Sequence, residues 1–134
     1  MGEKATGTFT IDTWEDRVYD EREGATLGKV HVEKTFEGAL KGTGTAELLT
    51  VLDGEGNPAV YVAVERFTGT LDGRPGTFVL HHTAPGGPGE RMSVRVVPGT
   101  ATGELIGLTG TLTIDIDDQG AHSYTLEHDQ HARE

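Results

Sequence analysis

Two runs of alternating residues joined by Asp72-Gly73 constrain the fold of this chain more than any other feature. The first run spans residues 59–71 and the second spans residues 74–83. An Asp-Gly pair between two apolar-rich runs favours a two-residue turn, so Leu71 is expected to face Arg74 in an antiparallel hairpin. Every other facing pair of the hairpin follows from that one.

The two faces of this hairpin differ in character. The register places Glu65 opposite Leu80 and Ala63 opposite His82, which makes Glu65 and His82 diagonal neighbours on one face. That face also carries the aromatic side chains and consists of Tyr61, Ala63, Glu65, Phe67, Phe78, Leu80 and His82. The other face consists of Val60, Val62, Val64, Arg66, Thr77, Val79, His81 and Thr83. We expect the aromatic face to point inward, because bulky side chains fill the interior of a small barrel.

The rest of the chain favours an all-β fold. It has 20 glycines in 134 residues, many threonines and valines, and almost no segment with a helical period. Strands are predicted near residues 5–14, 26–37, 42–52, 59–71, 74–84, 90–97, 107–116 and 122–130. We expect residues 1–134 to form a single domain, an eight-stranded antiparallel barrel with a central cavity, because closure removes the edges that a sandwich would have to protect.

Three further segments stand apart from the predicted strands. Residues 15–23 are highly charged, and we expect either a solvated connector or a loop that covers the barrel mouth. Residues 98–108 combine glycine and threonine with two leucines and an isoleucine, which predicts a short helical turn closing one end. The polar tail from His128 to Glu134 is expected to fray.

Charge and composition exclude several classes of function. The chain has 22 acidic and 11 basic residues, a net charge of −11 that opposes contact with nucleic acid or with an anionic membrane. It has no cysteine, which excludes thiol catalysis and thiolate metal sites. Since the sequence also lacks an apolar run of membrane-spanning length and a secretion signal, a cytoplasmic location is expected.

The outward face of the hairpin predicts an assembly. Four valines at positions 60, 62, 64 and 79 would stay exposed in a monomer, so a homo-oligomer is expected, most simply a dimer. The predicted pairing of residues 42–52 with the hairpin places Glu47 one diagonal step from Arg66. We therefore expect an ion pair between Glu47 and Arg66 on this outer surface.

Three strings of the sequence resemble a known family. They are residues 65–82, residues 96–108, and Ala5-Thr-Gly-Thr-Phe9 with Trp14. Together they resemble a bacterial family of small proteins of unassigned function, whose fold is similar to the barrel of allene oxide cyclase. The resemblance covers nearly the whole chain and implies an oligomeric eight-stranded barrel with an elongated cavity, of the kind that bends a reactive apolar substrate. By motif, it supports only Glu65 and His82 as site residues.

Glu65 and His82 form the candidate catalytic pair. A carboxylate beside an imidazole in an apolar cavity can exchange protons with a ligand, since burial raises the carboxyl pKa and histidine titrates near neutrality. The alternative is a mutually satisfied polar pair that fixes the strand register. The candidate ligand-binding residues are Trp14, Tyr61, Phe67, Phe78, Leu80 and Tyr124, although single aromatic side chains on strands also serve packing alone.

The histidines do not predict a metal site. His81 and His82 are adjacent on a strand, so they point to opposite faces and cannot bind one ion together. The sequence also has no Gly-x-Ser-x-Gly nucleophile motif and no phosphate-binding loop in a strand–loop–helix setting. We therefore expect neither a metal nor a cofactor.

Two functions from different classes remain. One is a barrel that binds an apolar small molecule and acts as a cofactor-independent cyclase or isomerase on a reactive apolar intermediate. The other is a non-catalytic, lipocalin-like carrier of such a molecule. Both need an apolar cavity with a few convergent polar groups, and only the pairing of Glu65 with His82 favours chemistry.

Overall fold

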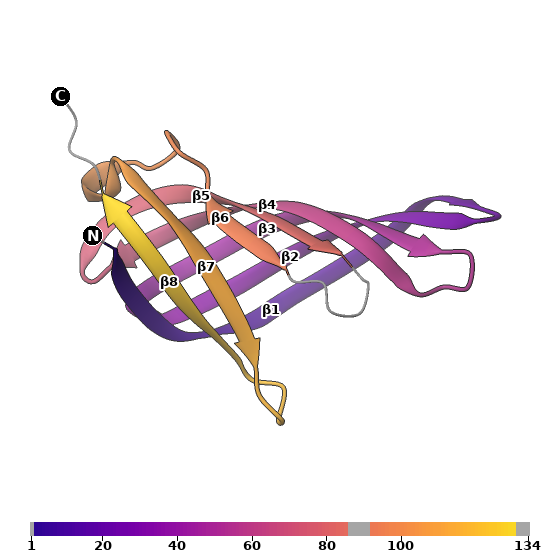
Figure 1. The fold of residues 1–134 in the computed structure, drawn as a ribbon, viewed down its shortest axis with the longest axis horizontal. Coiled ribbons are helices and arrows are strands. Elements are labelled where there is room, and N and C mark those ends of the chain that lie inside the picture. Colours follow the sequence, from indigo (N-terminus) through magenta and orange to yellow (C-terminus); the bar gives the residue numbers. More distant parts are fainter. Residues whose placement is uncertain (1, 86–91, 131–134) are drawn as a thin grey trace.

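The strands close into one barrel. The computed structural model describes residues 2–85 and 92–130. Its elements are β1 (Glu3–Arg22), β2 (Ala25–Gly38), β3 (Leu40–Asp53), β4 (Pro58–Leu71), β5 (Arg74–Pro85), β6 (Ser93–Val96), the 3-10 helix η1 (Gly103–Leu105), β7 (Leu108–Ile116) and β8 (His122–Gln130). Each strand pairs antiparallel with its neighbours in the sequence, and β1 also pairs with β8, so the barrel is closed (Figure 1). The predicted fold class is confirmed.

The central hairpin has the predicted register. Glu65 lies opposite Leu80 in the pairing of β4 with β5. Asp72 and Gly73 have φ angles of 51° and 82°, the left-handed conformation that a primed two-residue turn requires at both positions. The aromatic face points inward as expected, and Phe67 is fully buried.

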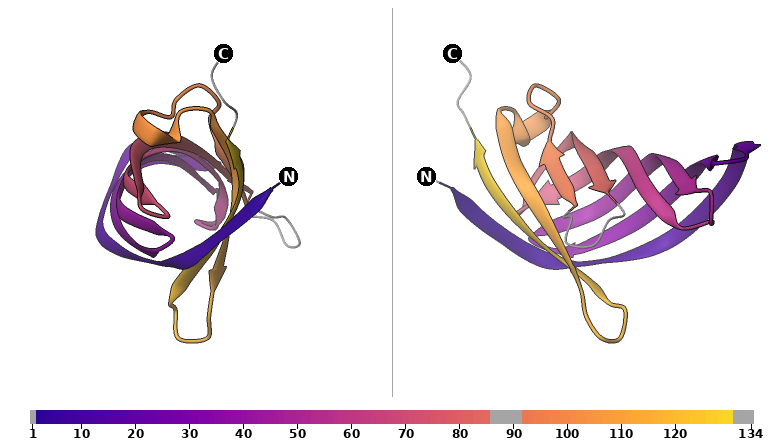
Figure 2. Two further views of the ribbon diagram at one scale, coloured as in Figure 1. Left: turned by 90° about the vertical axis from the view of Figure 1, so that its left-hand side faces the viewer. Right: turned by 45° about the vertical axis from the view of Figure 1, so that its right-hand side comes forward.

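Strand β1 is longer than predicted. The charged segment 15–23 was expected to be a loop, but β1 continues to Arg22 and pairs with β2 along its length. Two register shifts, between Ile11 and Thr13 and between Val18 and Asp20, interrupt this pairing. Such bulges bend and twist a strand. The hairpin of β1 and β2 projects beyond the rest of the barrel (Figures 1 and 2). Most of the charged side chains of residues 15–22 are exposed.

The barrel interior is divided into a packed half and a smaller apolar cluster. The packed half is formed by Ala5, Phe9, Phe36, Leu40, Phe67, Leu71, Phe78, Leu80, Val94, Val96, Leu105, Leu108, Leu112, Tyr124 and Leu126. Helix η1 lies at this end and buries Leu105 completely, as the predicted helical turn required (Figure 1). The smaller cluster is formed by Val30, Val32, Ala46, Leu48 and Ala63, with Tyr61 packed against it.

The predicted tail, the turn predicted after β5 and the strand predicted at residues 90–97 lie partly or wholly outside the described residues. The predicted fraying is wrong for His128–Gln130, because these residues belong to β8 and pair with β7. Residues 131–134 of the tail lie outside the described residues. So do residues 86–89 of the turn predicted after β5, and the first two residues of the strand predicted at 90–97, which is observed as β6.

The outer surface of the sheet is apolar in part. Val62 and Val64 are 42% and 55% exposed and lie beside Leu49, which is 49% exposed. Val60, expected on this outer face with them, instead borders the cavity and is 40% exposed. Val79 is half-buried rather than exposed, because the segment carrying Thr100 covers it and Thr100 Oγ1 accepts its N–H.

The ion pair predicted between Glu47 and Arg66 is replaced by another contact. Glu47 faces Val64 as predicted, but its carboxylate hydrogen-bonds Nδ1 of His31 at 2.5 Å. His31 lies directly opposite Glu47 in the β2–β3 pairing, whereas Arg66 is only a diagonal neighbour. Hydrogen bonds to Glu33 and Glu47 raise the pKa of His31 to about 9.

In residues 2–85 and 92–130, no helix has the length and apolar character needed to cross a membrane.

Candidate functional site

Three polar side chains form a layer between the packed half and the smaller cluster. Along the inward face of β2, Lys34 lies between Phe36 and Val32, and along β4, Glu65 lies between Phe67 and Ala63. His82 follows Leu80 on the inward face of β5. The alternation of each strand therefore directs one polar side chain to the same depth in the barrel.

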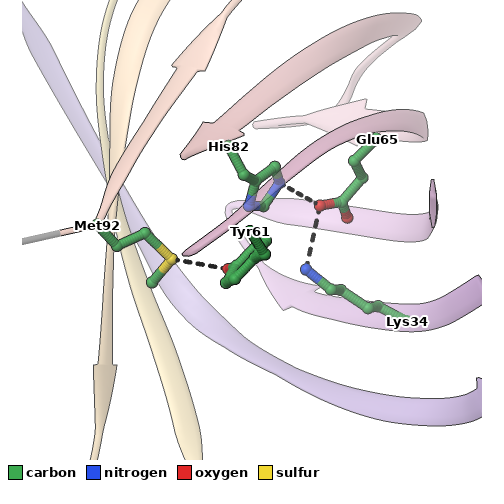
Figure 3. Close-up of polar contacts among 5 residues, drawn as sticks. All are labelled: Lys34, Tyr61, Glu65, His82 and Met92. Atoms are coloured by element: carbon green, nitrogen blue, oxygen red, sulfur yellow. Dashed lines mark hydrogen bonds and ion pairs between the residues drawn. The ribbon is translucent and has the colours of Figure 1, made fainter. Parts of the chain in front are cut away.

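One carboxylate oxygen joins the three side chains. Oε1 of Glu65 accepts a hydrogen bond from Nζ of Lys34 at 3.0 Å and lies 2.8 Å from Nε2 of His82 (Figure 3). The side chains of Glu65, His82 and Lys34 are 0%, 4% and 10% exposed. Since an ionised carboxylate only accepts hydrogen bonds, the proton of this contact sits on Nε2 of the imidazole.

Gly44 lets this ion pair cross a strand. Lys34 and Glu65 are on β2 and β4, which flank β3, and Gly44 pairs with Lys34 in the β2–β3 ladder. A Cβ atom at position 44 would overlap Oε2 of Glu65 and would lie 2.8 Å from Cε1 of Phe36. The missing side chain therefore provides the space that the carboxylate occupies.

The electrostatics of Glu65 differ from the expectation. Burial alone would raise the pKa of Glu65, but the hydrogen bond from His82 and the charge of Lys34 outweigh it, so the pKa is lowered. The expected rise in pKa assumed an apolar setting without a cation. The lowered pKa favours the carboxylate form of Glu65, which neutralises Lys34 and accepts the hydrogen bond from His82.

A cavity of about 770 Å³ lies on the far side of this layer from the packed half. Its walls include Val30, Val32, Ala46 and Leu48 of the smaller cluster. Lys34 and His82 line the cavity, whereas Glu65 is not among the described residues that do so. The residues of the polar layer that border the cavity are therefore Lys34 and His82.

Tyr61 and Trp14, two of the predicted ligand-binding residues, line the cavity. The Tyr61 hydroxyl donates to Sδ of Met92 at 3.1 Å (Figure 3), and burial, followed by the charge of Glu65, raises the pKa of Tyr61. Trp14 remains 55% exposed. A large aromatic side chain exposed in a cavity wall gives a ligand apolar surface to contact.

The other predicted ligand-binding residues lie in the packed half. Phe67, Phe78, Leu80 and Tyr124 are each at most 1% exposed and belong to the large cluster, which corrects their expected place in the cavity wall. The Tyr124 hydroxyl accepts from the N–H of Leu40 at 2.8 Å. These four residues act in packing because they face the half of the barrel that side chains fill.

Lys34 is the site residue that sequence reasoning missed. Its signal was present in the alternation of β2, where Val30, Val32, Lys34 and Phe36 share one face. A lysine on an otherwise apolar inward face requires a buried counter-charge. That counter-charge is Glu65, which lies on the inward face of β4, two residues from Phe67, the residue in register with Lys34 through Gly44.

The described residues offer little for a metal ion. Among them, no group of three or more histidine, aspartate or glutamate side chains is arranged to hold one. His82 is buried and His81 is exposed on the other face, as their adjacency predicted.

Comparisons with known proteins agree with the fold. No curated protein matches the chain. Among solved structures, it is similar to a protein of unknown function from Shewanella oneidensis MR-1, with 34% sequence identity, a TM-score of 0.88, and coverage of 98% of this chain and 100% of that chain. The Shewanella protein is described as a DUF3224 family member. A family model described as "Protein of unknown function (DUF3224)" matches residues 5–128, and the chain therefore belongs to the DUF3224 family.

Proposed function

We propose that this protein binds an apolar small molecule inside its barrel, with one polar group of the ligand at Lys34 and His82. The observation that carries the proposal is the cavity of about 770 Å³, whose apolar walls end at a buried polar layer. Pockets of this size and lining bury most of the surface of a small organic ligand. The absence of cysteine from the sequence supports a cytoplasmic location for this activity.

The apolar walls supply affinity and the polar layer supplies orientation. The exposed apolar side chains that line the cavity include Ile11, Trp14, Val18, Val60, Met92 and Ile116. Covering such surface with a ligand contributes roughly 25 cal/mol per Å² of apolar area removed from water. A carrier needs nothing more than this arrangement.

Two variants of adjacent residues on β3 test the proposal. Leu48 is 8% exposed and lines the cavity, whereas the neighbouring Leu49 is 49% exposed on the outer face. Nile red, an apolar fluorescent dye, is expected to bind the parent protein and Leu49→Trp with similar affinity, and to bind Leu48→Trp at least tenfold more weakly. Equal binding to all three proteins, each shown to be folded by circular dichroism, contradicts a ligand site in the cavity.

A catalytic role is the second candidate. The favouring observation is that His82 lines the cavity while its Nε2 is 2.8 Å from the buried carboxylate of Glu65. A carboxylate that orients an imidazole is the supporting half of many acid–base sites. A cofactor-independent cyclase or isomerase would use His82 as the proton carrier, and Lys34 would stabilise negative charge on the ligand.

A further inference from the structure

We propose that the ligand class is apolar ketones, and that Lys34 and His82 together catalyse their enolisation and the shift of a neighbouring double bond. This inference rests on the proposed binding function and adds a substrate class and a reaction to it. It is carried by the free hydrogen-bonding capacity of the two side chains and by the charge of the layer.

Lys34 has a donor available for a ligand. Its ammonium carries three N–H groups, of which one is directed to Oε1 of Glu65. Nζ also lies 4.9 Å from the centroid of the Phe9 ring, a cation–π contact that uses no hydrogen-bond acceptor. Because Lys34 lines the cavity, an N–H group remains for a ligand oxygen.

His82 presents a lone pair. When Nε2 donates its N–H to Glu65, the lone pair of the uncharged ring is on Nδ1. Nδ1 is on the side of the ring that faces away from Glu65 (Figure 3). Among the described residues it has no hydrogen-bond partner, and the ring lines the cavity. Nδ1 is therefore a base directed at the ligand space.

The charge of the layer favours a neutral ligand oxygen. The charges of Lys34 and Glu65 cancel, so a ligand carboxylate would add one uncompensated negative charge unless His82 took up a proton. A ketone carbonyl accepts the N–H of Lys34 without any such change. The other titratable side chains that line the cavity are Asp16, Arg17, Lys29, Tyr61 and His122; the first three are exposed, where solvent screens their charge.

The reaction balances without a co-reactant. Nδ1 of His82 removes a proton from the carbon beside the carbonyl, the electron pair of that C–H bond forms a C=C bond, and the carbonyl π electrons move to the oxygen. Lys34 stabilises the enolate oxygen and Glu65 stabilises the imidazolium. When the imidazolium exchanges its proton with water before the return step, reprotonation of the same carbon leaves a solvent hydrogen there. In a β,γ-unsaturated ketone, return to the γ carbon gives the conjugated isomer.

Hydrogen exchange on a simple ketone tests the step. Methyl nonyl ketone in D₂O is followed by NMR for deuterium uptake beside the carbonyl, and a β,γ-unsaturated ketosteroid is followed by ultraviolet absorbance. His82→Gln keeps a donor for Glu65 but removes the base, so the rate is expected to fall about 10²–10⁴-fold. Lys34→Met is expected to lower it about 10²–10³-fold. His81→Gln, on the outer face, is the matched control and should react like the parent.

Glu65 is tested as a positioning residue through the pH profile. Glu65→Gln retains an acceptor for Nε2 but no longer supports the imidazolium, so the pH at which the exchange rate is half-maximal is expected to fall. An unchanged pH profile would contradict the assigned role of Glu65.

Binding measurements separate this inference from the proposed function. Calorimetry in buffers of different ionisation enthalpy is expected to show no proton uptake for methyl nonyl ketone and uptake of about one proton for undecanoate. Undecanoate that binds tightly without proton uptake overturns the charge argument. Displacement of Nile red by the ketone without any exchange above the protein-free rate overturns the reaction but leaves the binding function intact. Failure of both Nile red and the ketone to bind overturns both.

Discussion

Glu65→Leu provides the sharpest test of how the polar layer is held together. The substitution introduces an apolar side chain of similar size and removes the oxygen that both Lys34 and His82 contact. The Lys34 side chain is only 10% exposed, so its charge would be left in an apolar setting without a counter-charge.

The expected cost follows from the burial of the two partners. Breaking a buried ion pair by removing one member costs about 3–5 kcal/mol of the free energy of unfolding. For a domain of this size, that loss lowers the melting temperature by roughly 10–20 °C. Removing the ammonium as well, in Glu65→Leu with Lys34→Met, leaves mainly the unpaired His82 nitrogen, which costs about 1–2 kcal/mol.

Urea unfolding of the parent, the two single variants and the double variant measures this difference as a double-mutant cycle. The double variant is expected to be about 2–3 kcal/mol more stable than Glu65→Leu alone. If the two substitutions are additive, the ion pair does not account for the stability of the layer, and the reasoning is refuted.

Four further predictions concern pH dependence, packing and assembly. Because the folded-state pKa of Glu65 is lowered, its contribution to stability is present above about pH 4 and is lost as the pH falls; urea midpoints of the parent should drop there more steeply than those of Glu65→Gln. The raised pKa of His31 has the opposite sign: its contribution is present below the ordinary histidine pKa and is lost as the pH rises through about 9, a loss that His31→Gln should abolish. Gly44→Ala is expected to lower the free energy of unfolding by about 1–3 kcal/mol, because the added Cβ overlaps the Glu65 carboxylate. Thr45→Ala, on the exposed face of the same strand, is its control. If Gly44→Ala is as stable as the parent protein, the crowding at position 44 is contradicted. We still expect a homo-oligomer that covers the exposed outer valines, so sedimentation of the parent protein should give the mass of a dimer. Val64→Lys should reduce that mass to the mass of a monomer. A monomer mass for the parent protein would contradict the expected assembly.

The fold could be predicted because hairpin chemistry is local. Asp72-Gly73 sets the register of β4 and β5, and the alternation of apolar residues then assigns the inward face. The length of β1 could not be predicted, since a strand that projects beyond the barrel has no buried face to impose an alternation on residues 15–23.

The site could be predicted only where it depends on one hairpin. The contact between Glu65 and His82 follows from the register of β4 and β5, which two adjacent strands determine. Lys34 reaches Glu65 across β3, and this contact depends on the pairing of two further strands and on the space above Gly44. The boundary between packed and hollow halves likewise depends on how all the strands fill the interior, so Phe67 and Phe78 were placed in the wrong half.

The division of the interior into two halves separates the aromatic packing of the barrel from the wall of its cavity. Leu48 and Val32 lie on the cavity side of the polar layer, whereas the packing of Phe36, Phe67 and Phe78 takes place on the other side. Substitutions on the cavity side therefore draw little on the aromatic core that secures the barrel. Under the proposed function, single changes in the cavity wall would alter ligand preference while leaving the stacked and edge-to-face contacts of the aromatic core in place.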